Sequence, residues 1–159
     1  MTENIRNISM NTDSPLEILL VEDLRTDALL IQRALKKGGV INPIKLVRDG
    51  QEALDYLFQR GSYQDTENYL IPGLILLDLK LPKINGFEVL KQIKSTEKLQ
   101  RIPVVVLTAS DQSKDINSAY DAGANSYLVK PVTLAAFIEV ATKIKLYWLL
   151  ENKSPSFER

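Results

Sequence analysis

Residues 74–78 read Leu-Ile-Leu-Leu-Asp, which is four consecutive apolar side chains followed by one carboxylate. A strand that is apolar at successive positions is buried on both faces, as in a parallel sheet covered by helices on each side. Four further apolar runs of strand length lie along the chain: Ile18–Val21, Ile44–Val47, Val104–Leu107 and Tyr127–Val129. The sequence therefore predicts five buried strands.

Segments with the apolar spacing of a helix follow each of these strands. The expected helices run from Leu24 to a closing glycine at Gly38, from a cap at Asp49 to Phe58, from Gly86 past Ile93, from a cap at Ser113 to a closing Gly123, and from a cap at Thr133 to Trp148. Five strand–helix alternations with right-handed crossovers predict an α/β fold. It is an open, doubly wound (βα)5 parallel sheet of flavodoxin-like type, with strand order 2-1-3-4-5.

The expected domain occupies residues 16–150. We expect residues 1–15 to be a flexible N-terminal segment and residues 151–159 a disordered tail. The polar stretch Arg60–Pro72, with Tyr63 and Tyr69, is expected to be one long loop.

The composition narrows the function classes. The 159 residues carry 20 Lys+Arg and 20 Asp+Glu, so neither nucleic acid nor an anionic membrane is expected to be held by bulk charge. The chain has no Cys and no His, which excludes disulfides, thiolate nucleophiles, zinc–sulfur sites and a phosphohistidine of its own. A bound metal would have oxygen ligands, which favours Mg²⁺, Mn²⁺ or Ca²⁺. With neither a signal peptide nor about 18 apolar residues in a row, we expect a cytoplasmic protein.

Polar residues end four of the five apolar runs. They are Glu22 and Asp23 after the first run, Asp78 after the third, Thr108 after the fourth and Lys130 after the fifth. Because the carboxyl ends of parallel strands line one crevice of an open sheet, we expect these side chains to meet there.

Three carboxylates in one crevice need a cation. Two like charges about 4 Å apart repel by about 4 kcal/mol at an effective dielectric constant near 20. We assign Glu22, Asp23 and Asp78 to a Mg²⁺ ion, with the backbone carbonyl of Lys80 as a further candidate ligand.

A carboxylate beside a divalent cation can also act as a nucleophile toward phosphorus. Asp78 is the best candidate acceptor because it ends the central strand, between the acidic pair and Lys130. Thr108 could then hydrogen-bond a phosphoryl oxygen, and the added negative charge could pull the following loop inward.

These residues resemble the receiver domains of two-component response regulators. The resemblance runs from about Glu17 to about Trp148 and rests on five motifs: Val21-Glu22-Asp23, Leu76-Leu77-Asp78-Leu79-Lys80-Leu81-Pro82, Asn85-Gly86, Val106-Leu107-Thr108-Ala109 and Tyr127-Leu128-Val129-Lys130-Pro131. It implies a single-domain switch rather than an enzyme with turnover. Asp78 would receive phosphate from a sensor histidine kinase, Glu22 and Asp23 would bind Mg²⁺, and Lys130 would pair with the phosphoryl group. It also implies that Thr108 and Tyr127 move together on activation and that the Lys130–Pro131 peptide bond is cis.

A narrower resemblance is to the small response regulators that serve cyanobacterial phytochromes. It rests on the long loop before the third strand, on the segment Arg101–Thr108 and on Tyr147-Trp148-Leu149. The position two residues after the acceptor departs from many receivers, because Lys80 stands there in place of Asn or another uncharged residue. A second ammonium near Asp78 could slow or speed loss of the phosphoryl group.

Each of these residues also has an ordinary structural interpretation. Asp23 could cap the first helix, Lys130 could extend from a strand end to solvent, Thr108 could be a satisfied buried hydroxyl, and Tyr127 could be a half-buried aromatic. Two other functions remain open. One is a phosphorylation-independent dimeric adaptor. The other is a Mg²⁺-dependent phosphohydrolase, which Lys80 disfavours because enzymes resembling the haloacid dehalogenase family carry a second Asp at that position.

The end of the last helix, Leu146–Leu150, is apolar around its full circumference. Either it packs against the first helix and the N-terminal segment, or it forms a homodimer through the fourth helix, fifth strand and fifth helix. The family resemblance favours the dimer.

Overall fold

The computed structural model describes residues 16–65 and 71–151, and it consists of one five-stranded parallel sheet between two layers of helices. The predicted N-terminal segment 1–15, Tyr69 and residues 152–159 of the predicted tail lie outside the described residues. Glu151, predicted as the first residue of the tail, is instead the last residue of a helical segment. The strands are β1 (Ile18–Val21), β2 (Ile44–Val47), β3 (Leu74–Leu77), β4 (Val104–Thr108) and β5 (Ser126–Val129). Their order in the sheet is β2-β1-β3-β4-β5, which confirms the predicted topology.

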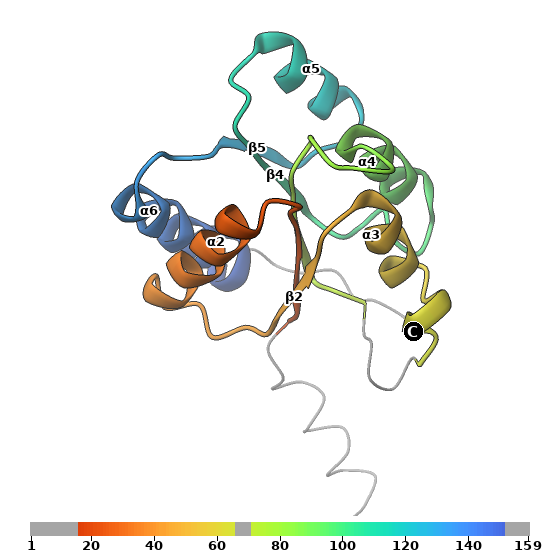
Figure 1. Cartoon of the computed structure of the whole chain (residues 1–159), viewed down its shortest axis with the longest axis horizontal. Coiled ribbons are helices and arrows are strands. Elements are labelled where there is room, and N and C mark those ends of the chain that lie inside the picture. The colour runs from red at the N-terminus through yellow and green to blue at the C-terminus, as the bar shows by residue number, and fades with distance from the viewer. Residues whose placement is uncertain (1–15, 66–70, 152–159) are drawn as a thin grey trace, which may run out of the picture.

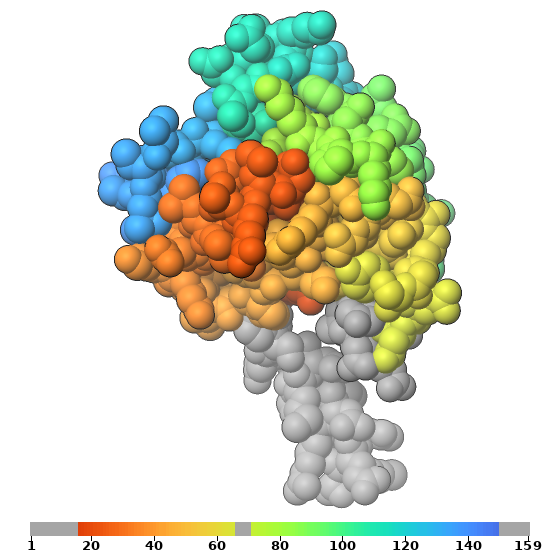
Figure 2. Space-filling view, in the orientation of Figure 1, coloured from red at the N-terminus to blue at the C-terminus, as the bar shows by residue number. Residues whose placement is uncertain are grey.

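The helices are α2 (Arg25–Lys37), α3 (Gly50–Leu57), α4 (Gly86–Ser95), α5 (Ser113–Asp121) and α6 (Leu134–Ile144), with a short 3-10 helix η1 (Gly61–Tyr63) and a π-helical extension η2 (Lys145–Glu151) after α6. Figure 1 shows α2 and α6 together on one side of the sheet and α3 and α4 on the other. Apolar side chains of α3, α4 and α5 form one buried core with the sheet, and those of α2 and α6 form the second. Figure 2, in the same orientation, shows that side chains close most of the space between the ribbons.

The central strands explain this layering. Every residue of β1, β3 and β4 is buried, because helices cover both faces of these strands. In the edge strand β2 only Val47 is fully buried, since the sheet ends there. The interpretation of consecutive apolar residues as two-sided burial therefore holds best at the centre, where the polar strand ends lie.

Local signals fix most helix starts. Asp49 Oδ1 accepts a hydrogen bond from the Glu52 amide at 2.7 Å, and Thr133 Oγ1 accepts one from the Ala136 amide at 3.2 Å, so both predicted caps are confirmed. The prediction for Ser113 was wrong: the cap position is Gln112, without a side-chain cap, and Ser113 is the first helical residue.

The closing glycines differ from each other. Gly123 has φ +103° just after α5, as a helix-ending glycine requires. After α2, the left-handed conformation falls on Gly39 (φ +88°), whereas Gly38 is still right-handed. The predicted stop was therefore one residue early, because two successive glycines leave either free to take that conformation.

The apolar end of the last helix is partly packed within the chain and partly exposed, so each of the two predicted arrangements holds for some of its residues. Trp148 packs against the core under α2 and α6, as the intramolecular account expects. Leu146 and Tyr147 keep 51% and 59% of their surface exposed. Part of the apolar run is therefore left uncovered within one chain.

Candidate functional site

The sheet register brings the predicted polar residues to one edge. Val21 of β1 pairs with Leu77 of β3, so the residues that follow, Glu22 and Asp78, lie side by side. Thr108 of β4 pairs with Val129 of β5, and the Lys130 amide donates to the Thr108 carbonyl at 2.7 Å. The carboxyl ends of β1, β3, β4 and β5 thus meet at one place, as parallel strands require.

Asp78 is held on both carboxylate oxygens. The Thr108 hydroxyl donates to Oδ1 at 2.8 Å, and the Lys80 amide donates to the same oxygen at 3.3 Å. Lys130 Nζ donates to Oδ2 at 2.8 Å. Asp78 is 5% exposed and Thr108 is fully buried, so these contacts fix the carboxylate in a site with little water.

Lys130 is the centre of an ion-pair cluster. Its ammonium lies 2.6 Å from Glu22 Oε2 and 2.8 Å from Asp78 Oδ2, and its side chain is only 7% exposed. It also contacts Asp27 Oδ2 at 2.9 Å. Three carboxylates therefore share one ammonium.

Sequence reasoning missed Asp27. Asp27 lies in the first turn of α2, one helical turn after Asp23, which places it over the same edge of the sheet. That i, i+4 spacing from the acidic pair was the signal that could have identified it.

Burial and charge move the pKa values of this cluster. Burial raises the pKa of Glu22 to about 7, and the neighbouring Asp78 charge adds to the rise, although Lys130 opposes it. Burial alone would lower the pKa of Lys130, but hydrogen bonds to Asp78, Glu22 and Asp27 outweigh it and raise that pKa. Burial thus dominates the shift of Glu22, whereas the neighbouring carboxylates dominate the shift of Lys130.

The donor set fits a divalent cation. One carboxylate oxygen from each of Glu22, Asp23 and Asp78 lies within 4.8 Å of the others, which is the only such group among the described residues. Glu22 Oε2 is buried and has no aligned hydrogen-bond donor, despite its ion pair with Lys130. Three carboxylate oxygens at this separation suit Mg²⁺ or Mn²⁺. Lys80 has an exposed side chain beside this group, and its carbonyl remains a predicted ligand.

A tight turn at Asn85-Gly86 packs closely against the backbone of Asp78. A Cβ atom on Gly86 would lie 2.3 Å from the Asp78 carbonyl oxygen and 2.5 Å from Leu79 Cα. The Gly86 amide donates to the Leu79 carbonyl at 2.9 Å, and Asn85 caps α4 through the Glu88 amide at 3.0 Å. Only glycine allows this close approach, so Asn85-Gly86 fixes the loop that carries the acidic site.

Tyr127 of β5 contacts the loop that follows Thr108 at the end of β4. The Tyr127 hydroxyl donates to the Ser110 carbonyl at 2.8 Å, two residues beyond Thr108. Burial raises the pKa of Tyr127, so the hydroxyl stays a donor at neutral pH. A movement of the loop after Thr108 would therefore change the contact of Tyr127.

The expected cis bond before Pro131 was wrong. The Lys130–Pro131 bond is trans, which is the lower-energy isomer for most X–Pro bonds. Lys130 reaches all three carboxylates with this isomer.

Comparison with known proteins gives the family. Residues 18–142 match the model of the response regulator receiver domain family. The chain belongs to this family.

Two relatives are about as long as this receiver domain. It is 44% identical over 147 residues to the probable methanogenesis regulatory protein FilR2 of Methanothrix harundinacea, covering 92% of each chain. It is 40% identical over 142 residues to response regulator Rcp1 of Synechocystis, covering 89% of this chain and 95% of Rcp1. The receiver domain is thus related to single-domain response regulators of phytochromes, which confirms the narrower resemblance.

Two solved structures match the receiver fold closely. The Mn²⁺-bound form of Rcp1 superposes with a TM-score of 0.80 at 42% identity, covering 89% of this chain and all of that one. The phosphorylated cyanobacterial phytochrome response regulator RcpA superposes with a TM-score of 0.83 at 44% identity, covering 90% of this chain and all of that one. Receiver domains are in general switches rather than enzymes with turnover. No helix in the described part of this one is long and apolar enough to cross a membrane.

Proposed function

We propose that this receiver domain accepts a phosphoryl group on Asp78 from a sensor histidine kinase, with Mg²⁺ bound by Glu22, Asp23, Asp78 and the Lys80 carbonyl. The observation that carries the proposal is the arrangement around Asp78, whose two oxygens are held separately by Thr108 and Lys130 within the acidic cluster. The relatives support it, because phosphorylated RcpA and Mn²⁺-bound Rcp1 have the same fold.

The transfer step needs little covalent chemistry from the protein. An Asp78 oxygen bonds to phosphorus while the phosphorus–nitrogen bond of the kinase phosphohistidine breaks, and the leaving imidazole keeps the electron pair and takes a proton from solvent. A bound divalent cation would neutralise charge on the phosphoryl oxygens. Lys130, which contacts Asp78 at 2.8 Å, would pair with a second phosphoryl oxygen, and the Thr108 hydroxyl would donate to a third.

Loss of the phosphoryl group follows the same logic. Attack by water on phosphorus would regenerate the Asp78 carboxylate and release inorganic phosphate. The domain thus catalyses its own phosphotransfer and dephosphorylation in this proposal, because the residues that stabilise the transferring group all belong to it. Lys80 is exposed beside Asp78 and is the first residue to vary when the lifetime is measured.

The signal would pass through α5, β5 and α6. A new negative charge at Asp78 attracts the Thr108 hydroxyl, which moves the loop that holds Tyr127 through Ser110. These elements and the extension η2 expose apolar side chains: Tyr120 (49%) on α5, Val129 (43%) on β5, and Leu146 (51%) and Tyr147 (59%) on η2. We propose a homodimer through this surface in the cytoplasm, with a bacterial phytochrome as the kinase.

The test is labelling with acetyl phosphate and Mg²⁺. The unmodified chain should gain an acid-labile phosphoryl group, which EDTA prevents. Asp78→Asn should gain none, whereas the matched control Asp121→Asn, an exposed aspartate in α5, should be labelled like the unmodified chain.

Two results would count against the proposal. Labelling of Asp78→Asn would show that the acceptor is another residue. An unmodified chain that neither acetyl phosphate nor a phosphorylated histidine kinase can label would favour the phosphorylation-independent adaptor.

A further inference from the structure

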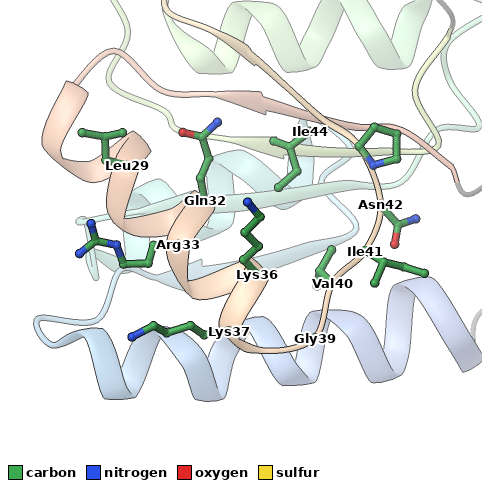
Figure 3. A pocket seen from close by; sticks show the side chains of 11 residues that line it. Leu29, Gln32, Arg33, Lys36, Lys37, Gly39, Val40, Ile41, Asn42 and Ile44 are labelled. Carbon is green, nitrogen blue, oxygen red and sulfur yellow. The ribbon is translucent and has the colours of Figure 1, made fainter.

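A basic, apolar groove lies on the outer side of α2, facing the edge strand β2. It has a volume of about 950 Å³, and its walls are the exposed face of α2 and the segment from Gly39 to Ile44. Figure 3 shows side chains from both walls around the space between them. The groove is thus built from two neighbouring elements rather than from one loop.

The lining of this groove includes large apolar side chains that are exposed to solvent. Leu29 on α2 is 56% exposed, and Ile41 on the facing segment is 84% exposed. Ile44 and Val40 continue the apolar lining toward the core. Two large, exposed apolar side chains that line one groove are characteristic of a surface that another molecule covers.

The charged residues that line the groove are all basic. Arg33, Lys36 and Lys37 line it, and no acidic residue does so. Among the described residues none of these three cations has an ion-pair or hydrogen-bond partner, although acidic and basic residues balance over the whole chain.

These cations also lie close to one another. Arg33 is three and four residues before Lys36 and Lys37, so their like charges share one helix face and repel. The helix dipole favours the two lysines in the last turn of α2. It does not account for Arg33 one turn earlier, or for the exposed Leu29 beside it.

The groove is separate from the acidic site. Leu29 follows Asp27 by two residues, which at 3.6 residues per turn points it about 200° around the helix axis from Asp27. None of the groove residues belongs to the cluster around Asp78. A molecule bound in the groove would therefore leave the phosphoryl-accepting edge open.

We infer that this groove docks an acidic amphipathic helix of a partner protein. Apolar side chains of such a helix would cover Leu29 and Ile41, and its carboxylates would face Arg33, Lys36 and Lys37. Leu29, Arg33 and Lys36 follow one another at i, i+4 and i+7 along α2, about 10 Å at 1.5 Å per residue, which matches two turns of a partner helix. Docking at this surface does not require phosphorylation of Asp78.

The test uses the full chain and a synthetic probe. The probe is a helical peptide of about 15 residues with Leu at every third or fourth position and Glu on both flanks. We expect it to shift the amide NMR signals of Leu29, Arg33 and Ile41 in a saturable way, with no phosphoryl donor present. A peptide with Lys in place of Glu should not bind.

Two variants locate the binding. Arg33→Glu with Lys36→Glu should weaken binding of the acidic peptide by about tenfold and restore binding of the Lys peptide. Lys91→Glu, an exposed lysine on α4, is the matched control and should leave the affinity unchanged. Ile41→Asp should weaken binding without affecting the fold, since Ile41 is 84% exposed.

Any of four results would overturn the inference. Equal binding of both peptides would show an apolar contact without charge selectivity, and shifts confined to other elements would place the site elsewhere. Groove signals that change with protein concentration would identify a second copy as the occupant. Signals that change on deletion of residues 1–15 would identify the N-terminal segment. A failed labelling of Asp78 would not affect this test, because no phosphoryl group takes part in it.

Discussion

Glu22→Gln should make the metal-free protein more stable and the metal-bound protein less so. Glu22 is 1% exposed, and burial raises its pKa from 4.5 to about 7. A rise of that size corresponds to about 3 kcal/mol of unfavourable free energy when the carboxylate is ionised in the folded state. Gln has the same shape but no charge, so the variant avoids this penalty.

The size of the stability difference between Glu22→Gln and the unmodified protein depends on pH. Because the folded-state pKa lies above the unfolded value, the protonated form of Glu22 stabilises the fold fully below pH 4.5, and this contribution is lost as the pH rises through about 7. In EDTA the variant and the unmodified protein should therefore be equally stable near pH 4.5. Near pH 8 the variant should be more stable by about 3 kcal/mol.

Urea unfolding at both pH values, with and without Mg²⁺, measures this difference. Mg²⁺ should stabilise the unmodified protein, since ligands that bind only the folded state do so, and the gain should be much smaller in Glu22→Gln. Glu97→Gln is the matched control, since it removes the charge of an exposed carboxylate that lies after α4 and outside the acidic cluster. If Glu22→Gln is less stable than the unmodified protein in EDTA at pH 8, the burial argument for Glu22 is wrong.

Three further substitutions test separate contacts. Gly86→Ala should lower the free energy of unfolding in urea by about 1–3 kcal/mol or more, because its Cβ would lie 2.3 Å from the Asp78 carbonyl oxygen. Lys91→Ala on the same helix is the control, and equal stabilities of the two variants would refute the close approach. Asp27→Asn should cost at most about 1 kcal/mol, since Asp27 is 31% exposed, and should retain labelling by acetyl phosphate; complete loss of labelling would make Asp27 part of the acceptor machinery. Tyr147→Ser should lower the sedimenting mass without loss of stability, whereas Trp148→Ala should cost about 3 kcal/mol because Trp148 packs on the core; an unchanged mass for Tyr147→Ser would argue against the dimer surface.

The sequence predicted the strands because a strand that is buried on both faces is apolar at every position. Their order followed from the parallel α/β topology. Residues 74–77 can be apolar throughout only where helices cover both faces. The meeting of Glu22, Asp78 and Lys130 followed from topology, since parallel strands present their carboxyl ends at one edge. Long-range geometry was predictable here because the sheet imposes it.

Features set by helix orientation were harder to predict. Asp27 was missed because a carboxylate in the first turn of a helix is common for dipole reasons alone. The balanced composition indicates no basic patch, yet the helical spacing of Arg33, Lys36 and Lys37 places them together on α2. That they border a groove depends on residues 39–44, which form its other wall. Which side of a helix meets which loop depends on packing, and one sequence does not record it.

The charges around Lys130 differ between unphosphorylated and phosphorylated Asp78. Glu22, Asp23, Asp27 and Asp78 carry four formal negative charges against the one ammonium of Lys130, which leaves an excess of three. A divalent cation reduces that excess to one, and a phosphoryl group in place of the Asp78 charge raises it to about two. Because the new charge lies on the Asp78 side, Lys130 gains more from moving toward it than from keeping the partly exposed Asp27. Phosphorylation should therefore release Asp27, so that the first turn of α2 responds to the acceptor together with the loop that holds Tyr127.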